Sequence, residues 1–234
     1  MQVSTTRMGF CNTFLLGPVK NRYLLIDAGV KGKEERFFRN LETWNISPGQ
    51  IDFILVTHAH HDHIGALHSI KEATNARVII HEKEALFIEK GLITIPKGFT
   101  RFGKIMSSLG KRFMEGNQSF KPVEADITIG NTDQALDDYG FPLAIIHTPG
   151  HTAGSVSVID KSSQKAFVGD AMFNVPVLPA GKIHPPFADN ATLLPASWKR
   201  LLSFQVKYYY PAHGKRIPRS LLENELLARK TSLK

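Results

Sequence analysis

The sequence predicts an α/β fold (α+β in some schemes) in which two sheets pack face to face and helices cover the outside. Short apolar runs rich in branched residues, which are typical of buried strands, occur in both halves of the chain, and helical segments alternate with them. With 234 residues, of which 42% are hydrophobic and 21% charged, the chain can form a single domain over residues 1–234 with a full core.

The first half alternates between strand and helix patterns. Phe37, Phe38, Leu41 and Trp44 lie on one face at helical spacing, and the run from Ile51 to Val56 is short, branched and apolar. In chain order we expect strands at 12–16 and 22–26 across a Gly17-Pro18 turn, a helix at 34–44, a strand at 51–56, a helix at 63–73, a strand at 77–80 and a short helix at 82–90.

Residues 91–122 interrupt this alternation. The spacing of the apolar residues predicts an amphipathic helical insert with basic residues between them; these residues are Phe102, Ile105, Met106, Leu109 and Phe113. The insert could dock on the core, cap a cleft, mediate dimerisation or rest on a membrane surface, and the sequence leaves these roles open.

The second half repeats the pattern. We expect strands at 126–129, 143–146, 154–159 and 165–168, a helix at 195–204, a strand at 207–210 and a final helix at 218–229. Apolar strands that end in an aspartate, Asp27 and Asp170, occur in both halves and hint at two similar halves.

A histidine-rich segment follows the strand at 51–56. Four of the ten histidines, together with Asp62, lie within residues 58–63, which is not the pattern of a core. Residues two apart in an extended chain point the same way, so His58 and His60 can approach one metal ion. If a helix begins next, Asp62 and His63 face a second position nearby. Imidazole and carboxylate are the donors expected for zinc, manganese or iron.

This His-x-His-x-Asp-His segment after an apolar strand resembles the signature of the metallo-beta-lactamase superfamily. Three further blocks resemble the rest of that pattern in order: His-Thr-Pro-Gly-His-Thr at 147–152, Ala-Phe-Val-Gly-Asp at 166–170 and Tyr-Pro-Ala-His-Gly at 210–214. The resemblance covers residues 12–214, and it implies a four-layer αβ/βα sandwich with metals at one edge between the sheets.

The resemblance also implies a ligand set for two divalent metal ions, with zinc expected and iron or manganese as alternatives. His58, His60 and His151 would hold the first ion, Asp62, His63 and His213 the second, and Asp170 would bridge both. A metal-bridging hydroxide would be the nucleophile, and Asp62, the expected catalytic residue, would orient it and take up a proton.

The remaining polar candidates have weaker patterns. Asp27 and Thr57 match positions that hydrogen-bond ligating imidazoles in the family, although a turn role for Asp27 is an equal alternative. His61 is expected not to be a ligand, and His147 to be structural. His184 is expected in an exposed loop, with substrate contact as the alternative.

Departures from the family pattern narrow the range of reactions that we expect. Glyoxalase II is the best match in its motifs, yet only twenty-one residues follow His213, which leaves little of its glutathione-holding helical region. Quorum-quenching lactonases carry a tyrosine where Phe173 stands, and the commonest beta-lactamases carry a cysteine where Asp170 stands. We therefore expect a glyoxalase II-like hydrolase of a small ester, thioester or lactone. The alternatives are a phosphodiesterase or nuclease on the same metal centre, or a metal-binding sensor module without turnover.

Charge and cysteine content limit the choice of binding partners and of cellular compartment. The net charge of +8 comes from residues 90–121 and from the tail after residue 214, and the remainder is close to neutral. This favours a small-molecule substrate over nucleic acid, and the local positive charge can attract an anionic substrate. The lone Cys11, expected in the core, and the lack of a signal or membrane-spanning run predict a cytoplasmic protein. Monomer and homodimer both remain open.

Overall fold

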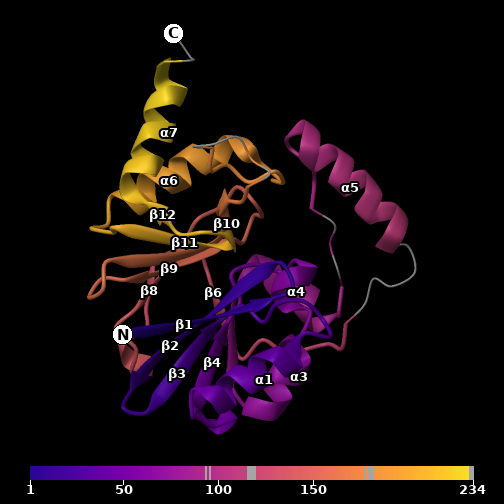
Figure 1. The fold of residues 1–234 in the computed structure, drawn as a ribbon, viewed down its shortest axis with the longest axis vertical. Helices are drawn as coiled ribbons and strands as arrows, with labels where there is room; N and C mark the ends of the chain where they lie inside the picture. The colour runs from indigo at the N-terminus through magenta and orange to yellow at the C-terminus, as the bar shows by residue number, and fades with distance from the viewer. Residues whose placement is uncertain (93, 95, 115–119, 177, 179–181, 232–234) are drawn as a thin grey trace.

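Two six-stranded sheets face each other in the structure, a computed structural model that describes residues 1–92, 94, 96–114, 120–176, 178 and 182–231 (Figure 1). The strand orders are β1-β2-β3-β4-β5-β6 and β12-β11-β10-β9-β8-β7. The first sheet contains β1 (Gln2–Met8), β2 (Cys11–Val19), β3 (Arg22–Ile26), β4 (Ile51–Leu55), β5 (Arg77–His81) and β6 (Ile127–Ile129). The second contains β7 (Gln134–Ala135), β8 (Ala144–His147), β9 (Val156–Asp160), β10 (Lys165–Asn174), β11 (Tyr208–Gly214) and β12 (Ile217–Pro218).

Helices cover the outer face of each sheet. On the first sheet lie α1 (Glu34–Thr43), α3 (Leu67–Thr74) and α4 (Glu82–Glu89), and on the second lie α6 (Leu194–Leu202) and α7 (Arg219–Thr231) (Figure 1). The short α2 (His61–Ile64) follows β4, and α5 (Arg101–Met114) stands apart from the layers. The predicted four-layer αβ/βα sandwich is thus confirmed.

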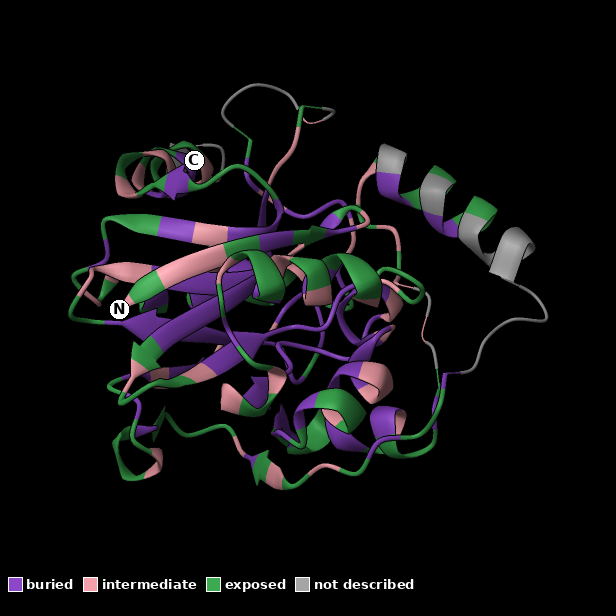
Figure 2. Cartoon of the chain, turned by 60° about the horizontal axis from the view of Figure 1, so that its bottom comes forward, coloured by how far each residue is buried: buried purple, intermediate pink, exposed green. Residues whose placement is uncertain are grey.

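Apolar side chains fill the spaces between these layers. Phe14 and Phe53 from the first sheet meet Phe167 from the second in the central core. A second cluster packs α1 and α3 against the first sheet, and a third, around Trp198, packs α6 and α7 against the second. Figure 2 shows the buried strands at the centre and exposed residues on the outer helices. Burial from both sides explains why the strands are continuous apolar runs.

The start of the chain differs from the prediction. Residues 2–8 form β1, an edge strand that pairs with β2 although its sequence is largely polar. The turn between β2 and β3 is at Lys20 and Asn21, whose φ angles are +48° and +65°, and not at Gly17-Pro18, which lies inside β2. Asparagine tolerates this left-handed conformation, and the pairing that follows puts Val19 opposite Arg22.

The predicted helix at 63–73 is interrupted. It begins earlier, as α2, and a second helix, α3, starts at Leu67. Between them Gly65 packs against the loop at residues 29–31, where an added Cβ would lie 2.4 Å from the Lys31 backbone nitrogen. Ala28 N–H donates to the His63 carbonyl at 2.7 Å, so tertiary hydrogen bonds replace the continuing helix.

The insert contains α5, which contacts the molecule through its first half. Gly103 packs against the Pro186 carbonyl, which also accepts hydrogen bonds from the Phe99 and Thr100 N–H groups. Ile105 and Leu109 are exposed, at 62% and 45%. The predicted apolar positions Phe102, Met106 and Phe113 have side chains outside the described part of the structure. None of the helices in the described ranges is long and apolar enough to cross a bilayer.

Candidate metal centre

The ligand candidates gather at one edge of the sandwich. The segment 58–63 leaves the carboxyl end of β4, which lies between the parallel strands β3 and β5. His151 lies in the loop between β8 and β9, Asp170 in β10 and His213 in β11. The carboxyl ends of neighbouring parallel strands meet at one edge, and the pairing of β10 with β11 therefore brings Asp170 and His213 together.

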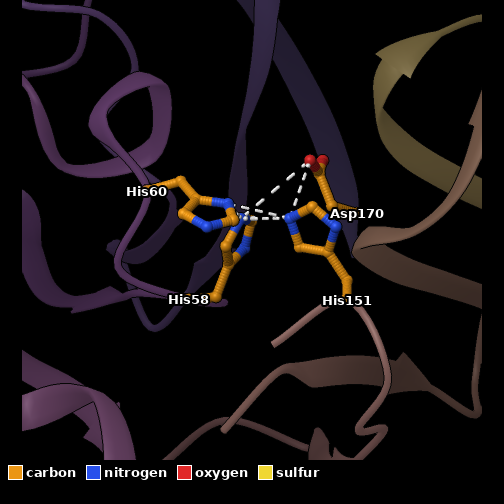
Figure 3. A group of neighbouring side chains, drawn as sticks. All are labelled: His58, His60, His151 and Asp170. Atoms are coloured by element: carbon orange, nitrogen blue, oxygen red, sulfur yellow. Dashed lines mark hydrogen bonds and ion pairs between the residues drawn. The ribbon is translucent and has the colours of Figure 1, made fainter. Parts of the chain in front are cut away.

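Four buried side chains form the first cluster: His58, His60, His151 and Asp170. His60 Nδ1 lies 3.0 Å from His58 Nε2 and 2.8 Å from His151 Nε2. Asp170 Oδ2 is 3.3 Å from His151 Nε2 and 3.9 Å from His58 Nε2. Figure 3 shows all four pointing toward one another. They come from both halves of the chain, so the folded sandwich assembles the cluster.

Asp62, His63 and His213 form a second buried cluster beside the first. Asp62 Oδ2 lies 3.1 Å from His213 Nε2 and 3.8 Å from His63 Nε2. Asp170 Oδ1 is 3.3 Å from His213 Nε2 and 3.4 Å from His63 Nε2. Asp170 therefore turns one carboxylate oxygen to each cluster, which is the arrangement expected of a bridging ligand.

The chemistry of these groups suits cations. His63 Nε2 and Asp170 Oδ1 are buried and have no hydrogen-bond partner among the described residues, although buried polar atoms are normally satisfied. Imidazoles around one zinc ion would have nitrogens about 3.3 Å apart, close to the separations in the first cluster. Two candidate sites that share Asp170 suggest two metal ions, and the donors suit zinc, iron or manganese alike.

The pKa values of the imidazoles depend on whether other imidazoles or carboxylates surround them. Burial, helped by the neighbouring imidazoles, lowers the pKa values of His58 and His60 well below their usual range. Burial opposes ionisation of Asp170, but the charges of His213, His63 and His151 hold its pKa well below the usual value. Burial likewise opposes the charge on His213, yet Asp170 and Asp62 raise its pKa to about 10. The carboxylates thus attract positive charge, as protons or as metal ions.

Hydrogen bonds on the far nitrogens fix the orientation of the imidazoles. His63 Nδ1 lies 2.8 Å from Asp27 Oδ2, and Asp27 also accepts from the Thr57 N–H and hydroxyl. His151 Nδ1 donates to the Phe187 carbonyl at 2.9 Å and His213 Nδ1 to the Phe10 carbonyl at 3.1 Å. These contacts leave each Nε2 directed into the centre. The contacts expected of Asp27 and Thr57 are confirmed, and Asp27, with a φ of +59°, also forms the turn after β3.

Gly169 brings β10 close to the histidine segment. Its φ is +48°, and an added Cβ would lie 2.7 Å from Thr57 Oγ1. Thr57 Oγ1 in turn lies 3.1 Å from His58 Nδ1. A left-handed glycine immediately before Asp170 therefore allows the two halves to meet where their ligands converge.

The other predicted positions lie outside both clusters. His61 is partly exposed and points its Nδ1 at Asp62 Oδ1, 3.6 Å away. His147 stacks on His81 with ring centroids 4.6 Å apart, a pair that the sequence did not indicate, and its Nε2 donates to a backbone carbonyl. His184 is partly buried and contacts Phe99 edge-on, whereas Cys11 is a buried core residue as expected.

Sequence reasoning missed one buried acid at the centre. Glu84 in α4 accepts hydrogen bonds from the Ala59 and Gly154 N–H groups, and both of these residues lie in ligand-bearing loops. It stands in an apparently ordinary amphipathic helix, so nothing in its local pattern marks it. The carbonyls of Phe10 and Phe187 were missed for the same reason, because a backbone acceptor leaves no trace in the sequence.

A family model described as the metallo-beta-lactamase superfamily matches residues 6–213. The chain belongs to this superfamily. A probable metallo-hydrolase of Methanocaldococcus jannaschii is 32% identical over 177 residues, which are 74% of each chain. The hydroxyacylglutathione hydrolase GloC of Haemophilus influenzae is 27% identical over 82% of this chain and 79% of its own.

Solved structures share the fold. The BLEG-1 B3 metallo-beta-lactamase has a TM-score of 0.71 at 22% identity, over 95% of this chain and 97% of its own. TTHA1623, solved in a di-iron-bound form, has a TM-score of 0.66 at 25% identity, over 94% and 96%. This protein is therefore a metallo-hydrolase of the superfamily whose His and Asp clusters can hold two ions.

Proposed function

We propose that this protein is a glyoxalase II-like, dinuclear metal-dependent hydrolase that cleaves a small ester, thioester or lactone, with zinc as its metal. The observation that carries the proposal is Asp170, whose two oxygens face one cluster each. When bound, the two ions would lower the pKa of a shared water and polarise the substrate carbonyl. The relationship to GloC supports the thioester as the first substrate to test.

Asp62 has a position suited to proton transfer. Its Oδ2 faces His213 and His63, and its Oδ1 lies 3.6 Å from His61 Nδ1. One oxygen can therefore act as a ligand while the other orients the attacking water and receives its proton. Its pKa is lowered, because the charges of His63 and His213 outweigh burial, so the carboxylate is ionised.

Aromatic groups beside the second cluster support an acyl substrate. The Phe10 ring is 52% exposed and lies 5.9 Å from the His213 ring, centroid to centroid. Phe173 stacks on His213 at 4.6 Å. An apolar acyl chain would gain contact area on the exposed Phe10 ring. An isolated β-bridge between His60 and Thr94 brings the insert beside the ligand segment, which supports the role of the insert as a cap.

The test is metal analysis together with turnover on matched substrates. Purified protein should contain about two transition-metal ions per chain, and chelation should abolish hydrolysis. The substrates are a 4-nitrophenyl ester, an S-acylglutathione thioester, a γ-lactone and bis(4-nitrophenyl) phosphate. We expect the acyl compounds to be cleaved faster than the phosphodiester. The opposite order would favour the phosphodiesterase alternative, and bound metals with no turnover of any substrate would favour a sensor module.

A further inference from the structure

The two loops that carry the histidines of the first cluster are irregular, so the distance between the loops depends on the contacts that hold them. Ala59 lies between His58 and His60 in the segment that joins β4 to α2. Gly154 lies three residues after His151 in the loop that leads to β9. The loops belong to different halves of the chain, and their imidazole nitrogens approach to 2.8–3.1 Å.

One side chain joins both loops. Glu84 Oε2 accepts from the Ala59 N–H and Glu84 Oε1 from the Gly154 N–H, each at 3.0 Å. Glu84 is 4% exposed, and these two N–H groups are its hydrogen-bond partners among the described residues. Gly154 is closely fitted to it, since an added Cβ would lie 2.5 Å from Glu84 Cγ. A carboxylate with two acceptor oxygens suits this task, whereas an amide can accept on one side only.

We propose that Glu84 is a positioning residue for the metal centre: it sets the distance between the His58–His60 loop and the His151 loop, and so the affinity of the first cluster for its ion. Among the described residues it forms no hydrogen bond or ion pair with a ligand side chain, and it acts through backbone N–H groups in the loops that carry three of the ligands. The inference rests on the proposed metal centre and does not depend on which substrate is hydrolysed. Residues that orient metal ligands from outside typically change metal affinity 10- to 100-fold when they are replaced.

Glu84→Gln is the informative substitution, because it keeps the shape but turns an NH₂ group toward one of the two N–H donors. Metal-free protein would be titrated with Zn²⁺ in competition with a chromophoric chelator. We expect one of the two dissociation constants to rise by about 10- to 100-fold. Glu84→Asp, whose carboxylate is one methylene short of the loops, should show a similar loss.

The matched control is Glu225→Gln on α7, a buried glutamate that pairs with Arg229 at 3.0 Å, far from the clusters. Thermal unfolding of the metal-free variants shows whether each is folded. If Glu84 only anchors α4, both glutamine variants will lose some thermal stability while their zinc affinities match the wild type, and the proposal is overturned. Wild-type protein that binds zinc but hydrolyses nothing would defeat the proposed function alone; wild-type protein that binds no zinc would overturn both.

Discussion

The first half of the chain supplies four of the seven ligand candidates from one segment, residues 58–63, whereas the second half supplies three from separate places, namely His151, Asp170 and His213. A contiguous segment sets the spacing of its own ligands through local geometry. Scattered ligands depend on strand register and on contacts between halves. The second half should therefore tolerate less disturbance of its surroundings, although its ligands are fewer.

The supporting contacts differ as well. His63 is held by a side chain, Asp27, while His151 and His213 are held by the carbonyls of Phe187 and Phe10. Side-chain support can be removed by a single substitution, but carbonyl support persists through any replacement that keeps the backbone in place. The comparison of the two halves thus makes separate predictions for side chains and for backbone.

Asp170→Ala should have the largest effect, because in the described part of the chain it is the residue whose carboxylate oxygens face both clusters. We expect loss of one of the two ions and a fall in kcat/KM of more than about 100-fold, since even residues outside the ligand set affect metal sites by up to that factor. Metal analysis and steady-state kinetics measure both. Asp138→Ala, at an exposed position on the second half, is the control. An unchanged rate for Asp170→Ala would refute the ligand assignment.

Asp27→Asn should come next. The variant keeps the shape but replaces one acceptor oxygen with a donor, so either the Thr57 N–H loses its acceptor, or the Thr57 hydroxyl and His63 Nδ1 lose theirs. We expect metal affinity at the second cluster to fall about 10- to 100-fold. Competition titration measures this loss. Affinity equal to the wild type would mean that β4 and α2 orient His63 without Asp27.

Phe10→Ala tests whether the backbone carbonyl of Phe10, and not its side chain, orients His213. The carbonyl that accepts from His213 Nδ1 remains, so metal content and zinc affinity should stay within about twofold of the wild type. Loss of the exposed ring should raise KM for an acyl substrate by roughly tenfold, the order expected when part of a phenyl contact is lost. A fall in zinc affinity with no change in KM would reverse the roles assigned to ring and carbonyl.

The smallest effects should come from two aspartates at strand ends, Asp126 next to β6 of the first sheet and Asp160 at the end of β9 in the second sheet. Burial opposes ionisation at both, but Lys71 and the Val78 N–H lower the pKa of Asp126, and the Ser162 and Ser163 side chains lower that of Asp160. A carboxyl whose pKa is depressed in the folded state stabilises the fold above its unfolded pKa of about 4, and that stabilisation is lost as pH falls further.

Urea unfolding of Asp126→Asn and Asp160→Asn at pH 7 and pH 3 measures this contribution. Each variant should be less stable than the wild type at pH 7, by about 1 kcal/mol, and the gap should narrow at pH 3. Salt should weaken both contributions, because Asp126 forms an ion pair with Lys71 and Asp160, besides its serine partners, lies 3.6 Å from the Met1 amino group. If the stability difference between variant and wild type is the same at both pH values, the two aspartates are not stabilising the fold through their ionised form.

Much of the architecture could be predicted because burial on both faces makes the strands continuous apolar runs. The prediction failed where tertiary contacts override the local pattern. β1 is a largely polar edge strand, the helix at 63–73 gives way to hydrogen bonds around Gly65, and β10 continues to Asn174, six residues past its expected end, because β11 pairs with it. A strand that continues through a neighbour's hydrogen bonds needs no apolar pattern of its own.

For the metal centre, spacing could indicate that His58 and His60 act together, since residues two apart in extended chain share a side. It could not join them to His151 or His213, and only the family resemblance did so. Neither residue spacing nor the family resemblance could indicate Glu84. Its function comes from two N–H groups on distant loops, and no property of the helix sequence around it distinguishes such a residue from a solvent-facing glutamate.

The close approach of Gly169 to Thr57 limits which substitutions these two positions can accept during evolution. Any side chain at 169 would collide with the threonine, and a larger residue at 57 would press on β10. Glycine at 169 cannot be replaced, and Thr57 cannot become larger, without moving the halves apart, so descendants of this chain should retain glycine at 169 and a residue no larger than threonine at 57.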